Sequence, residues 1–191
     1  MPVRPAGLLG ITALSLYNFG MIVAAILLSS TLCLSQSLAP YIPTPEEVVD
    51  RMLALAEVTR DDTVIDLGSG DGRIPIRAAQ KYGARGVGVD IDPRRVEEAR
   101  ANARKAGVEH LVEFRLEDAM TTDVSKGTVV TLYLHTSSNA KLRPVLTTQL
   151  APGSRIVSHA FSMGADWPAD KVDRFVSGSG DQVTLYLWKV R

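Results

Sequence analysis

The stretch VIDLGSGDGRI, residues 64–74, combines an acidic residue with closely spaced glycines, a pattern that can bind a ligand. Asp66 precedes glycines at positions 68, 70 and 72, and glycine lets a backbone approach a ligand closely because it has no Cβ atom. A phosphate-binding P-loop requires a lysine after its last glycine, and this stretch has none. The dinucleotide fingerprint G-x-G-x-x-G requires a glycine where Arg73 stands. These two ligand classes are therefore excluded, although the pattern by itself is also typical of a plain glycine turn.

Two further acids stand at positions that suit a nucleoside. Asp90 closes the apolar stretch 86–89, and Asp118 follows the apolar stretch 111–116. A carboxylate at the first position can accept hydrogen bonds from both ribose hydroxyls, and one at the second from an adenine amino group. Each acid alone could be a solvated cap at a strand end. The glycine loop, Asp90 and Asp118 stand at the ends of three successive strands. Together they predict one ligand site at the carboxyl edge of a sheet.

The ligand that suits these positions best is S-adenosylmethionine. The N-terminus of a helix behind the glycine loop offers free N–H donors to a carboxylate. S-adenosylmethionine carries a carboxylate, a ribose and an adenine but no pyrophosphate. A tighter loop than the dinucleotide-binding loop can therefore bind it. The sequence therefore predicts S-adenosylmethionine as the cofactor.

The segments that must position these residues alternate between strand and helix patterns. Repeated strand–helix units imply a parallel sheet with helices on both faces, and the polar turn at 177–181 indicates a final antiparallel hairpin. Thr44 is the expected N-cap of the first helix. Strands are predicted at 63–67, 86–89, 111–116, 129–134, 154–158, 172–176 and 183–190, and the last helix at 139–149. The predicted fold is α/β: a Rossmann-like, doubly wound, mostly parallel seven-stranded sheet with a C-terminal antiparallel hairpin.

The N-terminal segment has a different character. No charged side chain lies between Arg4 and Glu46, and residues 8–34 form an apolar run. Such a run can cross about 30 Å of hydrocarbon as one transmembrane helix. The alternatives are a cleaved signal peptide, because residues 37–39 resemble a cleavage site, and a buried core helix. The predicted division is a membrane anchor or signal sequence at 1–39 and a ligand-binding domain at 40–191.

Composition limits the partners. The 191 residues contain 21 Lys plus Arg and 21 Asp plus Glu, so no net field gathers nucleic acid and no nucleic-acid partner is predicted. The single cysteine, Cys33, excludes a disulfide framework. The three histidines lack the spacing of metal ligands, so no metal site is predicted. The sequence makes no prediction of oligomeric state.

Several motifs resemble those of one enzyme class, over residues 41–191. The chain resembles a class I, seven-stranded S-adenosylmethionine-dependent methyltransferase. More narrowly, it is similar to small membrane-anchored methyltransferases related to the mitochondrial protein-lysine methyltransferases of the adenine-nucleotide carrier and the ATP synthase c-subunit. The stretches that carry the resemblance are Tyr41-Ile42-Pro43-Thr44-Pro45, Asp66 to Arg73, Leu142-Arg143-Pro144, Val157 to Phe161, and Trp167.

The resemblance implies methyl transfer from a sulfonium to a nucleophile. A lysine side chain of a membrane-associated protein is the implied acceptor. The alternatives are a membrane-associated small molecule, such as a quinone or lipid headgroup, and a non-catalytic nucleotide-binding module. No Asn-Pro-Pro-Tyr or Asp-Pro-Pro-Tyr motif follows the fourth strand, where residues 133–138 read YLHTSS, and this argues against amide or exocyclic-amine acceptors.

Site residues follow from the motifs and the resemblance together. In the family the tyrosine segment folds over the cofactor, which makes Tyr41 a candidate for both cofactor binding and catalysis. His135 is the second catalytic candidate, because it could accept a proton or hydrogen-bond the acceptor; His159 ranks below it. The predicted cofactor-binding residues are Tyr41, Thr44, Asp66, Gly68, Ser69, Gly70, Gly72, Asp90 and Asp118.

Localisation is predicted from cofactor supply. Basic residues on the two sides of the apolar run are nearly balanced, so the positive-inside tendency gives no orientation. S-adenosylmethionine is made in the cytosol. We therefore expect a single-pass membrane-anchored protein with its catalytic domain on the cytoplasmic side, or on the matrix side in a mitochondrion.

Overall fold

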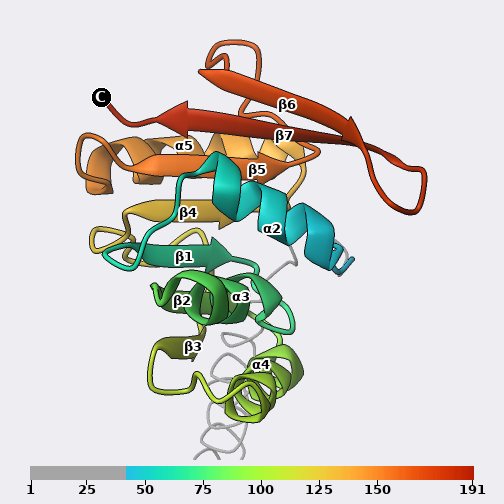
Figure 1. The fold of residues 1–191 in the computed structure, drawn as a ribbon. Helices are drawn as coiled ribbons and strands as arrows, with labels where there is room; N and C mark the ends of the chain where they lie inside the picture. The colour runs from blue at the N-terminus through green and yellow to red at the C-terminus, as the bar shows by residue number, and fades with distance from the viewer. Residues whose placement is uncertain (1–41) are drawn as a thin grey trace, which may run out of the picture. The chain divides into compact units, whose positions relative to one another are not determined.

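A computed structural model describes residues 42–191, which fold around one seven-stranded sheet with the order β3-β2-β1-β4-β5-β7-β6 (Figure 1). Strands β1 to β5 run parallel to one another, while β7 is antiparallel to both β5 and β6. The strands are β1 (Thr63–Leu67), β2 (Arg85–Asp90), β3 (Val112–Leu116), β4 (Val129–Leu132), β5 (Arg155–His159), β6 (Lys171–Val176) and β7 (Gln182–Lys189). The predicted Rossmann-like, mostly parallel sheet with a C-terminal hairpin is confirmed.

Some predictions concern residues that the structure does not describe. The anchor or signal sequence at 1–39, its transmembrane helix and the candidate contact Tyr41 all lie outside the described residues. Within residues 42–191, none of the helices combines the length and apolar character needed to cross a membrane. The transmembrane helix therefore stays a prediction.

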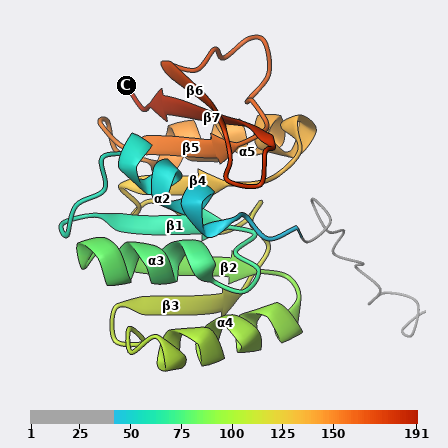
Figure 2. The same cartoon turned by 45° about the vertical axis from the view of Figure 1, so that its right-hand side comes forward.

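Helices cover both faces of the sheet, because parallel strands bury apolar side chains on both sides. One face carries α2 (Glu46–Leu55), α3 (Arg73–Tyr82) and α4 (Pro93–Lys105), while α5 (Thr136–Gln149) covers the other (Figure 2). Each face of the sheet has its own apolar core, and strand β1 contributes alternate side chains to the two cores. Val64 packs in the core under α2 and α3, and Ile65 packs in the core under α5.

The start of α2 differs from the prediction. Pro45, not Thr44, is the N-cap residue, and no side chain caps the helix. The Thr44 hydroxyl instead lies 3.4 Å from His159 Nδ1. Glu47, three residues after Thr44, accepts a hydrogen bond from the backbone N–H of Gly178 at 2.7 Å. The segment before α2 is thus held by distant parts of the chain rather than by its own helix.

The β4–α5 connection also differs from the prediction. The strand ends at Leu132 and the helix begins at Thr136, three residues before the expected start. The connection is therefore short, and Tyr133 and His135 leave the carboxyl end of the strand directly. His135 is the exposed N-cap residue of α5.

Candidate active site

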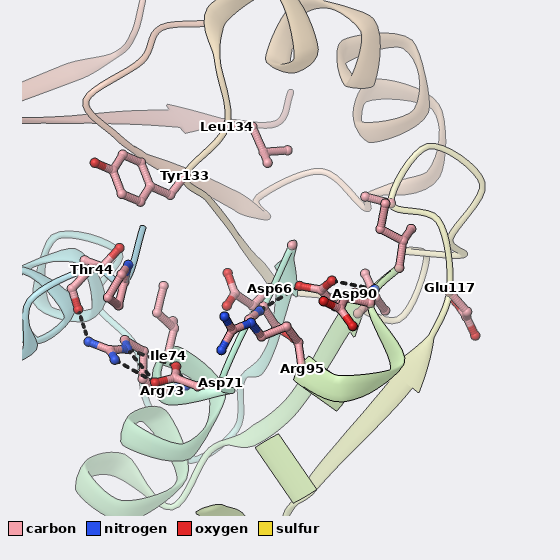
Figure 3. Close-up of a pocket in the computed structure, with 18 of the residues that line it drawn as sticks. Thr44, Asp66, Asp71, Arg73, Ile74, Asp90, Arg95, Glu117, Tyr133 and Leu134 are labelled. Carbon is pink, nitrogen blue, oxygen red and sulfur yellow. Dashed lines mark hydrogen bonds and ion pairs between the residues drawn. The ribbon is translucent and has the colours of Figure 1, made fainter. Parts of the chain in front are cut away.

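A cavity of about 550 Å³ opens at the carboxyl ends of the parallel strands (Figure 3). Ligands of open α/β sheets bind at this edge, where the loops after adjacent strands diverge. The cavity lies within the size range of sites for cofactors and drug-sized molecules. The lining residues that concern its chemistry are Thr44, Asp66, Gly68, Ser69, Gly70, Asp71, Arg73, Asp90, Arg95, Glu117, Asp118, Tyr133 and Leu134.

The glycine loop forms the floor of this cavity. Its glycines at 68, 70 and 72 have φ values of 86°, 53° and 79°, in the left-handed region that other residues adopt only with strain. A Cβ atom on Gly72 would lie 2.6 Å from the ring of Phe114. Gly72 is absent from the cavity lining, so the need for glycine at this position comes from the tight packing against Phe114 beneath the loop. Its predicted cofactor contact stays a prediction.

Asp90 ties the second strand to the glycine loop and still faces the cavity. Its Oδ2 accepts from the backbone N–H of Gly70, and its Oδ1 from that of Asp92, each at 2.9 Å. A carboxylate has about four acceptor positions, so each oxygen keeps capacity for one more donor. Asp118 is similarly placed after β3, and its Oδ1 accepts from the N–H of Met120 at 2.9 Å. Both carboxylates can therefore accept hydrogen bonds from a nucleoside.

Asp66 is the most deeply buried acid of the cavity. It is 4% exposed, and burial raises its pKa to about 7. A hydrogen bond from Thr131 Oγ1 at 2.7 Å opposes this rise, and the negative charges of Asp90 and Asp71 add to it. The Asp66 carboxyl group therefore changes its protonation state near neutral pH. A cationic ligand group beside it would favour the charged form.

A polar clasp joins the segment before α2 to the glycine loop. Arg73 Nη1 donates to the carbonyl oxygen of Thr44 at 2.7 Å. The same guanidinium makes a two-point ion pair with Asp71, with Nη2–Oδ2 and Nε–Oδ1 distances of 2.6 and 2.9 Å. Figure 3 shows these contacts at one end of the cavity. We call the Thr44–Arg73–Asp71 set the Arg73 clasp; it holds Thr44 in the cavity wall.

Aromatic side chains gather where β4 and β5 end. The ring centroids of Tyr133 and His159 lie 4.0 Å apart, and those of Tyr133 and Phe161 lie 6.2 Å apart. Burial lowers the pKa of His159 to about 4, so its ring is neutral at physiological pH. We call Tyr133, His159 and Phe161 the aromatic wall. His135 meets Phe161 edge-on at 5.0 Å. Of these four residues, only Tyr133 belongs to the cavity lining, and His159 and Phe161 pack around it.

The structure brings most of the predicted cofactor residues together. Those in the lining are Thr44, Asp66, Gly68, Ser69, Gly70, Asp90 and Asp118. Sequence reasoning missed the cavity positions of Tyr133 and Arg95, and it ranked His159 below His135. The available signal for Tyr133 was its position directly after the fourth strand, at the same edge as the glycine loop.

The lining fits S-adenosylmethionine. Asp118 follows β3, Asp90 ends β2 and Asp66 is the last residue but one of β1. These strands are neighbours, so the three side chains, which we call the acid row, lie along one sheet edge. In that order they match an adenine amino group, a ribose diol and a cationic amino group. Strand order, glycine loop and acid row together define a class I S-adenosylmethionine-dependent methyltransferase, and the cofactor supplies a methyl group bonded to a sulfonium sulfur.

Comparisons with known proteins give the family. The sequence profile described as "ANTKMT methyltransferase domain" matches residues 66–171. A "Protein-lysine N-methyltransferase" of Saccharolobus islandicus (strain REY15A) is 43% identical over 152 residues, covering 79% of this chain and 93% of the relative. The lysine N-methyltransferase of the ATP synthase c-subunit from Xenopus laevis is 31% identical over 166 residues, covering 87% of this chain and 70% of the relative. The chain belongs to the ANTKMT methyltransferase-domain family.

A solved structure supports both the fold and the cofactor. A protein from Salinibacter ruber, described as an RNA methyltransferase in complex with S-adenosyl-L-homocysteine, is 55% identical to this chain with a TM-score of 0.72. The match covers 78% of this chain and 94% of that one. The bound molecule is what remains of S-adenosylmethionine after the methyl group has left. The predicted enzyme class, fold and cofactor are therefore confirmed.

Proposed function

We propose that the protein is an S-adenosylmethionine-dependent protein-lysine N-methyltransferase whose acceptor is a membrane-associated protein. The observation that carries the lysine acceptor is the 43% identity to a protein-lysine N-methyltransferase, extending over 93% of that relative. The Xenopus laevis relative, whose name gives lysine of the ATP synthase c-subunit as its target, supports the same acceptor class.

The site supplies what methylation of an amine requires. The chain must position two reactants, exclude water and leave the acceptor nitrogen unprotonated. A lysine amine has a pKa near 10.4 in water, and desolvation lowers that pKa. The Tyr133 ring offers an apolar surface in the cavity lining, and the neighbouring His159 ring adds no positive charge because it is neutral. The chain's contribution is therefore placement and desolvation rather than strong base catalysis.

The membrane part of the proposal has separate support. The uncharged apolar run at 8–34 has the length of a membrane span. Residues 42–191 form the catalytic domain. An anchored enzyme would meet acceptors held at the same membrane. We further propose that its catalytic domain faces the cytosol, or the matrix of a mitochondrion, where S-adenosylmethionine is supplied.

RNA is the second candidate acceptor. The Salinibacter ruber protein, which is 55% identical, is described as an RNA methyltransferase. Against RNA, acidic and basic residues balance at 21 each, so the chain lacks the net positive charge that draws in phosphate backbones. The residues after β4 also lack the motif typical of enzymes that methylate exocyclic amines. We therefore place lysine first.

The test is the fate of a labelled methyl group. The full chain in detergent is incubated with methyl-labelled S-adenosylmethionine and a membrane extract, which is then separated into protein, RNA and lipid fractions. Label in membrane protein supports the proposal. Label only in RNA or only in lipid would overturn the lysine acceptor, and label only in soluble protein would overturn the membrane-associated acceptor.

A further inference from the structure

We propose that Tyr133 is the acceptor-binding residue of this enzyme: its ring lines the entry for the acceptor side chain, and its hydroxyl oxygen accepts a hydrogen bond from the acceptor nitrogen. The inference deepens the proposed function and rests on it for the identity of the acceptor as a lysine. Three features of the structure support it: the position of Tyr133 in the cavity, its hydroxyl group, which makes no hydrogen bond within residues 42–191, and the strained turn that holds its neighbours.

The first feature is the position of Tyr133 along the edge of the sheet. The acid row assigns the adenosine end of the cavity to β3 and β2 and the amino-acid end to β1. The next strand along the sheet is β4, and Tyr133 directly follows it. In Figure 3, Asp90 and Glu117 lie at one end of the cavity, Thr44 and Tyr133 lie at the other, and Asp66 lies between them. Tyr133 therefore faces the end of the cavity that the nucleoside does not require.

The hydroxyl group is available for a substrate. Tyr133 is partly buried, and no residue among 42–191 forms a hydrogen bond with its hydroxyl. Among residues 42–191 this hydroxyl is not one of the buried polar atoms without a partner, so it is reachable from solvent and can exchange water for a ligand. If the oxygen accepts an N–H of the acceptor amine, the nitrogen lone pair stays free. The lone pair can then form the N–C bond to the methyl carbon as the S–C bond breaks; S-adenosylhomocysteine leaves as the thioether, and the methylated ammonium releases its extra proton to solvent.

A strained turn fixes the neighbours of Tyr133. Ala160 has a φ of 62°, and the N–H of Phe161 donates to the carbonyl oxygen of His159 at 2.8 Å. These two features define a γ-turn with positive φ, a rare and strained conformation. The N–H of Ala160 donates to the carbonyl oxygen of Thr184 at 2.8 Å, and Asn139 Nδ2 to that of Phe161 at 3.2 Å.

The consequence of the turn is a fixed aromatic wall. Residues in sparsely populated backbone conformations persist only where surrounding contacts enforce them, and they concentrate at functional sites. Here the enforced turn places His159 and Phe161 against the same tyrosine ring, with centroids 4.0 and 6.2 Å away. The Thr44 hydroxyl, 3.4 Å from His159 Nδ1, adds a further contact to the His159 ring. The Tyr133 ring is therefore held in place before a substrate arrives.

The test compares Tyr133→Phe with a matched variant, Tyr82→Phe, in the full chain. Tyr82 is a partly buried tyrosine at the end of α3, and it is absent from the cavity lining. The measurements are kcat and KM for a labelled acceptor protein, and the dissociation constant of S-adenosylmethionine by calorimetry. We expect Tyr133→Phe to lower kcat/KM for the acceptor about threefold to tenfold, the effect of one hydrogen bond between neutral groups. Cofactor affinity should change less than about twofold, and Tyr82→Phe should change neither quantity.

The outcomes separate this inference from the proposed function. If wild-type enzyme labels protein and Tyr133→Phe keeps kcat/KM within about twofold, the hydroxyl does not bind the acceptor and the inference is wrong. An equal loss of cofactor affinity in Tyr133→Phe would also overturn it, because the hydroxyl would then serve the cofactor. If wild-type enzyme labels RNA or lipid instead, the proposed lysine acceptor fails. Kinetics of the two variants with that acceptor then decide the role of Tyr133 by the same criterion.

Discussion

The Arg73 clasp gives the sharpest quantitative prediction for cofactor binding. Arg73 holds the carbonyl oxygen of Thr44 at 2.7 Å while it pairs with Asp71. Arg73→Lys keeps the positive charge but loses the planar fork. A lysine ammonium is a single point of charge that can remain near Asp71 without reaching both partners. The substitution should therefore release the segment before α2 from the cavity wall.

The size of the effect follows from the lost contact. A hydrogen bond to a charged group contributes about 1.5–3 kcal/mol. The Arg73 side chain is 30% exposed, so solvent screening places the contribution near the lower end of that range. About 1.4 kcal/mol corresponds to a factor of ten in an equilibrium constant. We expect the dissociation constant of S-adenosylmethionine to rise about tenfold.

The assay is calorimetric titration of wild type, Arg73→Lys and the control Arg77→Lys. Arg77 lies one turn further along α3 and makes a comparable two-point pair with Asp50, at 2.8 and 2.7 Å, outside the cavity lining. Arg77→Lys should leave cofactor affinity unchanged. Equal losses in both variants would show that a general weakening of ion pairs is responsible. Unchanged affinity in Arg73→Lys would refute the clasp as a determinant of cofactor binding.

Three further predictions concern the cavity and the aromatic wall. Asp90→Ala should weaken S-adenosylmethionine binding by about 2 kcal/mol or more in calorimetry, and it should lower the melting temperature, because two backbone N–H groups also lose their acceptor; unchanged affinity would mean that the ribose contact is misassigned. Because the raised pKa of Asp66 is about 7, its carboxyl group is mostly protonated below that value and must lose its proton to hold a cationic group. Affinity should thus rise about tenfold from pH 5.5 to pH 7, and Asp66→Asn should remove that dependence; an equal slope in the variant would assign it to another group. Ala160→Gly should not lower the melting temperature, because glycine adopts positive φ freely, but it should lower kcat/KM for the acceptor at least about threefold. Unchanged kcat/KM would show that the strained turn at Ala160 does not contribute to binding or positioning of the acceptor.

The alternation of strands and helices was predictable because most strands carry short apolar runs and several helices follow a turn or capping signal. Asp92, for example, caps α4 as its position before Pro93 predicts, with its side chain accepting from the N–H of Arg94. The acid row was predictable for the same reason. Once the strands are parallel, acids that end or follow successive strands must lie at one edge.

Contacts between distant segments were not predictable from local patterns. Thr44 has the spacing of an N-cap, yet its hydroxyl faces a histidine 115 residues away. The start of α5 was missed because Thr136, Ser137 and Ser138 are weak helix formers in their own right. Tyr133 and His159 become neighbours through the pairing of β4 with β5, and no local motif in the sequence indicates that contact. The cofactor half of the site was therefore predictable, and the acceptor half was not.

Transfer of the methyl group of S-adenosylmethionine to a lysine side chain is the central claim to test. The most direct test is complete acid hydrolysis of the protein fraction labelled by the full-length enzyme, followed by chromatography of its amino acids. We predict that the label elutes with N-methylated lysine, and that the label is lost in Asp90→Ala at limiting cofactor. Label on any other amino acid, or no label in protein from wild-type enzyme, would contradict the claim.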